Sequence, residues 1–375
     1  MKLLVLASRF PFPLEKGDKL RLYHHLRLLS RKHRICLVAL HLDEIKEADK
    51  KEIESFCEEI HTFKLGRIGS LFALIKGVFS KKPWQVSLFH RRHIERSIKE
   101  ISAQFKPDKV FCQLVRMAPY AAKIEAPVTL DIMDAFSLGM KRRAANSAWP
   151  LQLLFQEETR RLKRYEQQVL KDFEDCAIIS QQDADALGAA IRIVPNGVDT
   201  EHFAPSTDHK QSHDLVFVGN MGYFPNVQAS QCLVKEIVPL LEGAPRVLLA
   251  GARPSAAVKA LANEQIELTG WVDDIREAYL SGKVFAAPLF TGSGQQNKIL
   301  EAMALGIPCV TTSIVNNAIG ARHGEHILVA DSFTDFAACL ERLLADSELR
   351  DTIGKAARRF VVKNYSWEQA VAGLI

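Results

Sequence analysis

The sequence has few of the features that mark several large classes of protein. Its seven cysteines are scattered over 375 residues, and no two of them form a CxxC pair. A zinc ribbon or a thioredoxin-type redox motif is therefore excluded. With 20 glycines, 15 prolines and no low-complexity tract, collagen-like and disordered chains are excluded too. Scattered cysteines are typical of small buried apolar side chains in a reducing cytoplasm.

Long apolar runs are also missing. None approaches the roughly 18–20 residues that a membrane span requires. The N-terminal MKLLVLASRF has five apolar residues in a row, which is too short for a signal-peptide core and is interpreted as a buried strand. The sequence thus predicts a protein that is neither exported nor integral to a membrane.

The common catalytic signatures are absent. No GxGxxG follows the first strand, so the usual dinucleotide fingerprint is missing, and no GxxxxGK[ST] marks a P-loop. A metalloprotease or an α/β-hydrolase would carry HExxH or GxSxG, and neither occurs.

Charge is present but unevenly spread. The net charge is +5, yet residues 1–195 carry 34 Lys and Arg against 24 Asp and Glu, whereas residues 196–375 carry 15 against 20. A basic half joined to an acidic half indicates that only one half meets an anionic partner.

Two α/β domains are expected from the length, at roughly 150 residues per domain, and from the alternation of apolar runs with helical spacing. A parallel sheet covered by helices produces this alternation. The turn around Pro195, Asn196 and Gly197 predicts a hinge over 195–205. We therefore expect domains at 1–195 and 196–357 and a C-terminal helix over 358–375. Strands are expected at 3–7, 35–40, 109–111, 128–132, 177–180, 215–218, 246–250, 266–269, 284–288 and 308–311.

The most informative stretch is PLFTGSGQQNKILEAMALGIPCV at 288–310. A strand ends at Pro288, a Gly-Ser-Gly turn follows, and a helix begins near Gln295. Free N–H groups and the dipole at such a helix start attract anions, Lys298 adds a cation, and Glu301 lies on the same helical face. Together they describe a nucleotide-sugar site. The alternative is an ordinary loop with a surface Lys–Glu pair.

This stretch resembles the signature of retaining GT-B glycosyltransferases of family 4, glycosyl transferases group 1. The resemblance spans nearly the whole chain, with VPNGVD at 194–199, FVGNMGYFPN at 217–226, GWVDDIREAY at 270–279 and PFPLEKGDKLRLYHHLRLL at 11–29. GDKLR and QNKILEAMA are similar to sugar transferases of bacterial exopolysaccharide assembly. The family resemblance implies two doubly wound Rossmann-like domains with an interdomain cleft and a last helix that crosses back to the first domain.

The resemblance also implies residue roles. Glu301 matches the second Glu of the family's Glu-x7-Glu motif and would hold the donor ribose, while Lys298 would neutralise the diphosphate. The base would lie against Trp271 and Val272. Counting these, the donor-binding positions are Gly17, Gly219, Arg253, Trp271, Val272, Ser293, Gly294, Lys298 and Glu301.

Three positions depart from the family pattern. Ser293 occupies the place of the first Glu, which helps to bind the transferred sugar. Asn220 stands where many members have Arg, and Pro225 about where they have Lys. Lys298 must therefore supply more of the positive charge, helped by Arg253 or Arg21, because the leaving diphosphate needs electrostatic stabilisation.

A retaining transfer of this kind needs no obvious protein nucleophile, only positioning and stabilisation of the departing charge. The predicted catalytic residues are Lys298, Asp134 and Asn220. Asp131 and Asp134 follow a strand and could contact the acceptor or donor sugar, or else cap a helix or lie at the surface. No His/Asp cluster has metal spacing, so no metal cofactor is expected.

Residues 64–99 carry nine Lys and Arg against one Glu, mixed with apolar residues. This mixture suits an interfacial helix on anionic lipid, or a half-buried helix with a solvated basic face. Nucleic acid is not expected as a partner, since no binding motif accompanies the charge. We expect a peripheral protein on the inner face of the plasma membrane, whose partners are a nucleotide sugar (UDP- or GDP-linked), a lipid-linked saccharide acceptor and the anionic membrane surface. The predicted acceptor or membrane contacts are Lys76, Lys81, Lys82, Arg91 and Arg92.

Three functions remain open on the sequence: a retaining glycosyltransferase, a nucleotide-sugar epimerase of the same fold, and a non-catalytic module that binds a nucleotide sugar and scaffolds a membrane assembly.

Overall fold

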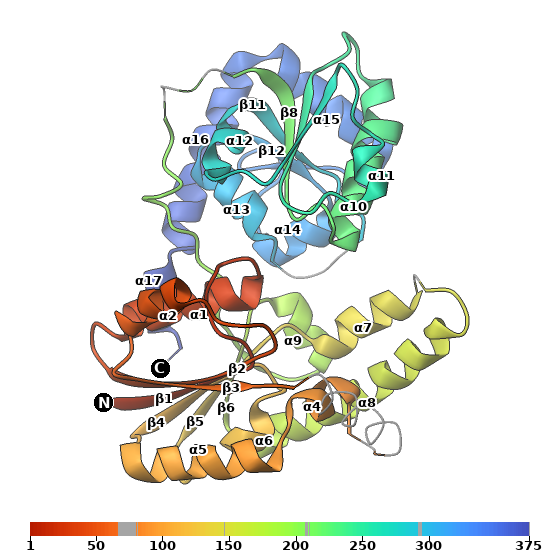
Figure 1. The fold of residues 1–375 in the computed structure, drawn as a ribbon. Helices are drawn as coiled ribbons and strands as arrows, with labels where there is room; N and C mark the ends of the chain where they lie inside the picture. The colour runs from red at the N-terminus through yellow and green to blue at the C-terminus, as the bar shows by residue number, and fades with distance from the viewer. Residues whose placement is uncertain are drawn as a thin grey trace. The chain divides into compact units, whose positions relative to one another are not determined.

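The structure is a computed structural model, which describes residues 1–66, 80, 82–145, 147–206, 209, 211–291 and 295–374. The chain divides into two compact units (Figure 1). The N-terminal unit comprises Met1–Pro195 together with Ala370–Ile375, and the C-terminal unit comprises Asn196–Gln369.

The N-terminal unit is built on a seven-stranded parallel sheet in the order β3-β2-β1-β4-β5-β6-β7. Its central strands are continuous apolar runs, as expected of strands covered on both faces; β1, for example, is KLLVLA, and its last five residues are buried. The strands are β1 (Lys2–Ala7), β2 (Arg34–His41), β3 (Glu59–Lys64), β4 (Lys109–Gln113), β5 (Val128–Met133), β6 (Asp175–Ile178) and β7 (Arg192–Ile193).

Helices cover both faces of this sheet, with α1 and α2 on one side and α5 and α6 on the other (Figure 1). Two helices, α7 and α8, form a long hairpin that projects from the unit. The helices are α1 (Gly17–Leu29), α2 (Glu47–Glu54), α4 (Trp84–Phe89), α5 (Arg92–Phe105), α6 (Ala118–Ala121), α7 (Phe136–Ala145), α8 (Leu151–Asp172) and α9 (Gln181–Leu187).

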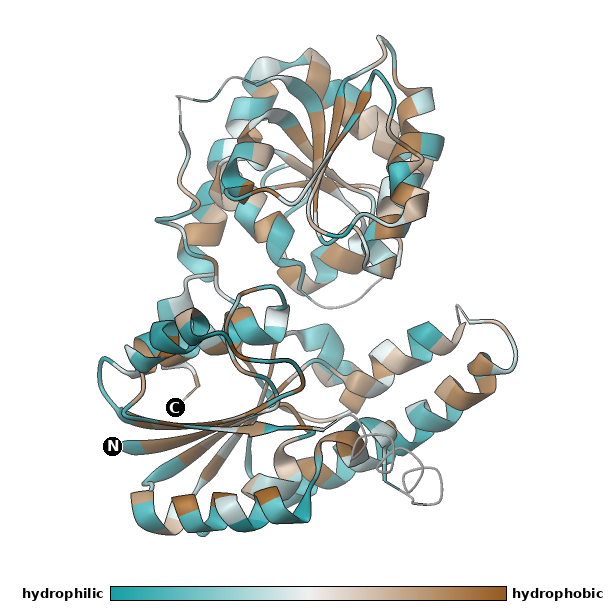
Figure 2. Cartoon of the chain, in the orientation of Figure 1, coloured by the Kyte–Doolittle hydropathy of each residue, from teal (hydrophilic) through white to brown (hydrophobic). Residues whose placement is uncertain are grey.

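The C-terminal unit repeats the plan with a six-stranded parallel sheet in the order β10-β9-β8-β11-β12-β13. Figure 2 shows that the strands of both sheets are mainly hydrophobic, and each sheet lies within its own buried apolar core. The strands are β8 (His213–Val218), β9 (Val247–Ala250), β10 (Ile266–Gly270), β11 (Gly282–Ala287), β12 (Cys309–Thr311) and β13 (Leu328–Val329).

Helices lie on both faces of the second sheet, α12, α13 and α16 on one and α10, α11 and α15 on the other (Figure 1). The last helix, α17, follows Ser366, whose hydroxyl accepts the Gln369 N–H at 3.2 Å and so caps the helix. The elements are α10 (Phe224–Cys232), η1 (Leu233–Ile237), η2 (Val238–Leu240), α11 (Ala256–Lys259), α12 (Ile275–Leu280), α13 (Asn297–Ala304), α14 (Ser313–Ile319), α15 (Phe333–Ala345), α16 (Ser347–Asn364) and α17 (Trp367–Ala372).

Both sheets are doubly wound, as the sequence predicts. In the first sheet the chain reverses its direction of travel between β1 and β4, and in the second between β8 and β11. Open α/β sheets bind ligands beyond the carboxyl ends of their strands at such switch points. Of the helices in the described ranges, none combines the length and the apolar character that crossing a bilayer demands.

Candidate functional site

The switch point of the C-terminal unit is lined by loops that lie unusually close together. Gly219 follows β8 and Gly251 follows β9, and the φ of Gly251 is +136°. A Cβ added to Gly251 would lie 1.9 Å from the carbonyl oxygen of Gly219. Only glycine accommodates this approach and this backbone angle, so the two loops form a tight floor beside α13.

Lys298 lies over this floor, in the first turn of α13. Its Nζ donates a hydrogen bond to Asn226 Oδ1 at 2.5 Å and lies 5.2 Å from the centre of the Phe217 ring. A Cβ on Gly219 would come within 3.2 Å of the same Nζ. Burial lowers the pKa of Lys298 to about 8, while the nearby Glu301 carboxylate opposes the shift. The site thus holds a half-buried cation against a neutral amide.

Glu301 lies one turn further along α13. The buried Tyr279 hydroxyl donates a hydrogen bond to Glu301 Oε2 at 2.7 Å. Burial raises the pKa of Glu301, and this bond and the Lys298 charge partly offset the rise. The pKa of Tyr279 is raised well above its ordinary value, chiefly by burial, so the tyrosine remains a donor. One carboxylate oxygen is therefore fixed in position by a rigid partner.

The start of α13 is tied to the turn at Asn196. Gln295 accepts the Asn196 N–H through Oε1 at 2.8 Å and donates to the Asn196 carbonyl through Nε2 at 2.8 Å. The Asn196 amide also donates to Asn297 Oδ1 at 3.2 Å. A reciprocal pair of this kind fixes the orientation of the helix N-terminus, whose N–H groups and dipole favour an anion.

The other predicted donor residues of this unit lie at the same edge of the sheet. Trp271 follows β10 and is 69% exposed, with Val272 beside it. The Gly251 N–H donates to the Gly270 carbonyl at 3.0 Å, which joins the β9 and β10 loops. Arg253, in the β9 loop, is exposed and has a φ of 56°.

The Asn220 side chain is engaged within its own loop. The Asn220 Oδ1 accepts the Gly222 N–H at 3.0 Å, so this side chain stabilises its own turn. Pro225 occupies the first turn of α10. Ser293 and Gly294 lie outside the residues that the structure describes.

In the N-terminal unit the structure corrects two expectations. Arg21 is fully buried, donates to both carboxylate oxygens of Asp131 at 2.7 and 3.0 Å, and also donates to the Val194 carbonyl at 3.0 Å. Arg21 cannot supply charge to a diphosphate, because its guanidinium is committed to this pair. Asp131 is equally buried, so it joins α1 to the sheet and does not contact a sugar.

Asp134 remains a predicted catalytic residue, and Gly17 remains a predicted donor-binding residue. Asp134 follows β5 at the carboxyl edge of the first sheet, where burial, reinforced by the Asp183 charge, raises its pKa to about 7. Gly17 is the exposed first residue of α1 and has open space around the position of a Cβ. The neighbouring switch point carries Gln113, whose amide donates to the Asp18 carbonyl at 2.9 Å.

The predicted basic contacts are only partly visible. Lys76 and Lys81 lie outside the described residues. Lys82 and Arg92 are exposed, whereas Arg91 donates to the carbonyls of Ser87 and His90 at 3.3 and 2.9 Å.

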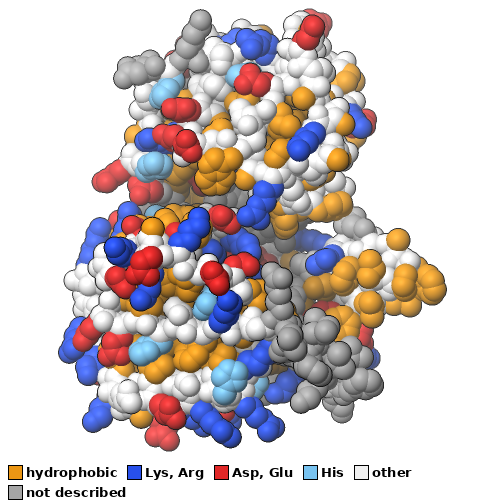
Figure 3. Space-filling model, in the orientation of Figure 1, with side chains coloured by type: hydrophobic (Ala, Val, Ile, Leu, Met, Phe, Trp, Pro, Cys, Tyr) orange, Lys and Arg blue, Asp and Glu red, His pale blue; other side chains and the backbone are white. Residues whose placement is uncertain are grey.

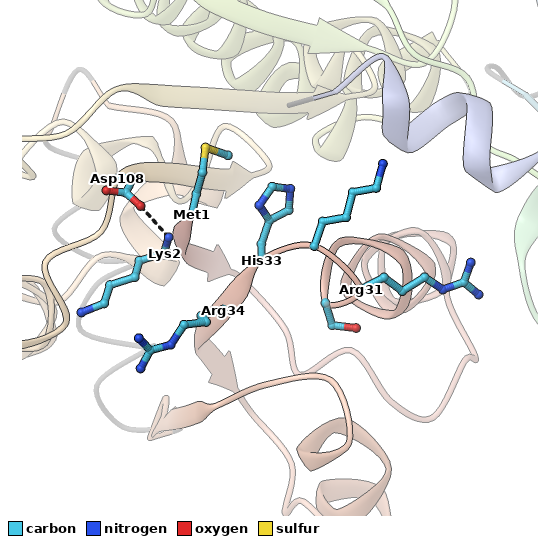
Figure 4. Close-up of a pocket in the computed structure, with 8 residues that line it drawn as sticks. Met1, Lys2, Arg31, His33, Arg34 and Asp108 are labelled. Atoms are coloured by element: carbon cyan, nitrogen blue, oxygen red, sulfur yellow. Dashed lines mark hydrogen bonds between the residues drawn. The ribbon is translucent and has the colours of Figure 1, made fainter.

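A separate hollow of about 510 Å³ occurs in the N-terminal unit, lined by Lys2, Arg34, Asp108 and their neighbours (Figure 4). It lies at the amino ends of β1 and β2, the edge opposite to the one at which doubly wound sheets bind ligands. Arg34 is paired with Glu58, and Lys2 Nζ donates to the Phe105 carbonyl at 3.1 Å. These two cations are therefore already engaged within the protein.

Metal-ligating groups do not gather at the switch points of the described ranges. One trio, Cys36, Glu59 and His61, places its ligand atoms within 4.8 Å of one another, but on the amino-terminal half of β2 and β3. Burial raises the pKa of Cys36 to about 12, which opposes the thiolate a metal would need.

Three residues that position the site were not singled out by sequence reasoning: Asn226, Tyr279 and Gln295. All three fall within quoted motifs, FVGNMGYFPN, GWVDDIREAY and GSGQQNKILEAMALGIPCV. Their roles depend on contacts between separate loops, and single-sequence spacing carries no such information.

Part of the sequence is similar to known proteins. Residues 212–346 match the family model described as glycosyl transferases group 1. The chain is 23% identical over its full length to an uncharacterized 44.6 kDa protein in the cps region of Klebsiella pneumoniae, covering 98% of that protein. A shorter match, 31% identical over 28% of this chain and 30% of the relative, is to the capsular polysaccharide biosynthesis glycosyltransferase CapM of Staphylococcus aureus.

Solved structures show the same fold. Sucrose-phosphate synthase from Thermosynechococcus elongatus superposes with a TM-score of 0.75 at 15% identity, covering 99% of this chain and 97% of that one. HepE from Anabaena, solved with UDP and glucose, superposes with a TM-score of 0.69 at 15% identity and the same coverage. Two Rossmann-like units, each with its switch point, define a GT-B protein. The chain has this fold, as the sequence predicts, and residues 212–346 are similar to the glycosyl transferases group 1.

Proposed function

We propose that the protein transfers a sugar from a nucleoside-diphosphate sugar to a lipid-linked saccharide, with retention of anomeric configuration, in exopolysaccharide or cell-surface glycan synthesis. The observation that carries the proposal is Lys298, a half-buried cation at the start of α13 above the Gly219–Gly251 floor. The cps-region relative and CapM support the polysaccharide setting, and the UDP bound to HepE supports a uridine donor.

In this proposal the bond between the sugar and the diphosphate breaks as the acceptor oxygen forms the new glycosidic bond on the same face, and the hydroxyl proton passes to the departing diphosphate oxygen. Negative charge then grows on the departing phosphate oxygen. Lys298 stabilises that charge in a site of low polarity, where electrostatic stabilisation is strong. Asn226 holds the ammonium in place at 2.5 Å without neutralising it.

Glu301 serves the donor ribose. A carboxylate accepts hydrogen bonds from sugar hydroxyls, and Tyr279 fixes one of its oxygens and leaves the other for the ligand. Trp271 offers an exposed ring for the base. No metal cofactor is part of the proposal, because Lys298 and the α13 N-terminus supply positive potential at the proposed diphosphate position.

The test is release of nucleoside diphosphate from a panel of UDP- and GDP-sugars, with and without a lipid-linked acceptor. The proposal expects release that depends on the acceptor and a product with the anomeric configuration of the donor. Interconversion of the free nucleotide sugar would instead identify an epimerase. Binding without either reaction would identify a scaffold.

A further inference from the structure

The end of the α7–α8 hairpin is apolar although it is exposed. Figure 3 shows hydrophobic side chains gathered there, and Figure 2 shows the start of α8 as hydrophobic. From Ala148 to Gln156 the sequence AWPLQLLFQ contains no charged residue. Four of its side chains are largely exposed: Trp149 by 77%, Leu151 by 52%, Leu153 by 55% and Leu154 by 48%.

Leu153 does not belong to the seam between α8 and its own unit. Leu162, which lies in that seam, is fully buried, whereas Leu153 is nine residues earlier. Nine residues at 3.6 per turn are two and a half turns, so Leu153 projects from the opposite side of α8. A surface helix normally turns its apolar face to the core, whereas the first turn of α8 exposes Leu151, Leu153 and Leu154.

The flanks of the tip are basic. Between Lys141 and Arg164 the sequence has seven Lys and Arg against two Glu. One carboxylate, Glu157, binds Arg160 and Arg161 at 2.7 and 2.8 Å. The other, Glu158, is buried and accepts the N–H groups of Trp84 and Gln85 at 2.9 and 3.1 Å.

One of the basic side chains lies against the apolar tip itself. The Arg143 guanidinium lies 4.5 Å from the centre of the Phe155 ring. A cation held there is placed beside the apolar residues, where the headgroups would lie if the tip entered a bilayer.

We propose that residues 148–155 insert into the interfacial region of an anionic lipid bilayer, with Lys141, Arg143 and Arg160 against the headgroups. Apolar side chains enter the acyl boundary, tryptophan favours the interface, and each basic residue near an anionic surface adds attraction. The proposal deepens the proposed function and rests on it, since a lipid-linked acceptor must be reached at a bilayer surface. It assigns the contact to the tip of α7 and α8 and not to Lys82 and Arg92.

A second copy of the chain fits the tip less well. A stable protein interface uses about 20–30 residues on each side, whereas the tip offers four largely exposed apolar residues. Its basic flanks would also repel those of an identical copy across a two-fold axis.

The test is co-sedimentation of the full-length protein with vesicles, at low salt and without donor. The wild type is expected to sediment with phosphatidylglycerol–phosphatidylcholine vesicles more strongly than with pure phosphatidylcholine. Leu153→Ser/Leu154→Ser should lower the partition coefficient about tenfold or more, because two leucines lose their burial. The matched control is Leu42→Ser/Leu240→Ser, which alters two leucines that are 44% and 49% exposed elsewhere and should sediment like the wild type.

Brominated lipid locates the contact. Bromine in the acyl chains should quench the wild-type tryptophan fluorescence, and Trp149→Phe should abolish that quenching while the protein still sediments. Equal sedimentation of the tip variant and the wild type would overturn the proposal, as would quenching that persists without Trp149. A lipid-free dimer that dissociates on Leu153→Ser/Leu154→Ser would also overturn it, in favour of self-association.

Donor turnover separates this proposal from the function on which it rests. The tip variant should release nucleoside diphosphate to a soluble acceptor analogue at the wild-type rate. If no variant turns over any donor but vesicle binding still follows the tip, the proposed function fails and the docking surface stands. If donor turnover occurs but vesicle binding does not depend on the tip, the docking surface is refuted and the proposed function stands.

Discussion

Replacing Lys298 by Met tests the site directly. Methionine is similar in length and apolar, so the substitution removes the ammonium and keeps most of the packing against Phe217. Burial disfavours the charged form of Lys298, as its lowered pKa of about 8 indicates. The variant should therefore unfold at the same temperature as the wild type or higher, while losing its chemistry.

The expected loss follows from the role of the charge. Removing one preorganised group that stabilises a developing oxyanion costs about 10²–10³ in kcat. The effect should fall mainly on kcat and less on KM, because the phosphate charge grows as the bond breaks. Lys298→Arg is the matched control that keeps a cation but changes its shape.

The pH dependence supplies an independent check. With a pKa of about 8 in the free protein, Lys298 is protonated below that pH and loses its charge above it. An anionic donor prefers the charged form, so kcat/KM should fall about tenfold per unit once the pH exceeds 8. Lys298→Arg stays charged and should not show that fall.

The test of Lys298→Met requires two measurements on the same preparations: the rate of nucleoside diphosphate release and the melting temperature. A Lys298→Met variant with kcat within twofold of the wild type would refute the assignment. A variant that loses activity together with its melting temperature would show a structural role instead.

Three further substitutions test the supporting contacts. Tyr279→Phe removes the hydrogen bond to Glu301 and leaves a carboxylate oxygen unsatisfied, which costs about 1–3 kcal/mol. Because that carboxylate is proposed to bind the donor, the KM for donor should rise roughly 5- to 100-fold in steady-state assays. Gly251→Ala places a Cβ against backbone and should destabilise the C-terminal unit by about 3 kcal/mol or more in urea unfolding, and a normal midpoint would contradict the tight floor. Arg21→Met leaves Asp131 buried without its partner and should cost about 3–5 kcal/mol; adding Asp131→Leu should recover much of it.

The fold was largely predictable because its central strands are uninterrupted apolar runs. Buried strands such as β1, β2 and β8 begin and end within two residues of the predicted limits. The missed strands, β3, β7 and β13, are peripheral. β3 reads EIHTFK and is half-exposed at the edge of its sheet, so hydropathy alone does not distinguish it from a loop.

The site was predictable at the level of motifs and not of contacts. Spacing and resemblance single out Lys298 and Glu301 as candidates, because a glycine turn before a helix is a local feature of the sequence. The role expected of Arg21 was wrong, because it depends on a contact between distant parts of the chain. Nothing local shows that Asp131, 110 residues away, is fully buried against it. Pairings across a parallel sheet depend on topology, which the sequence pattern leaves unspecified.

The acidic and the basic half of the chain are each proposed to bind an anionic partner, but by different means. Residues 196–375 are acidic overall, yet the proposed anion site lies among them. One half-buried lysine at the start of a helix affects the local electrostatic potential more than distant surface carboxylates do. The basic half carries its excess on exposed side chains, including those flanking the hairpin tip. Salt screens exposed charges over about 8 Å at physiological strength but reaches a half-buried pair much less. Raising the salt concentration should therefore weaken the proposed docking to anionic vesicles far more than it weakens the proposed donor binding, and net charge alone predicts neither.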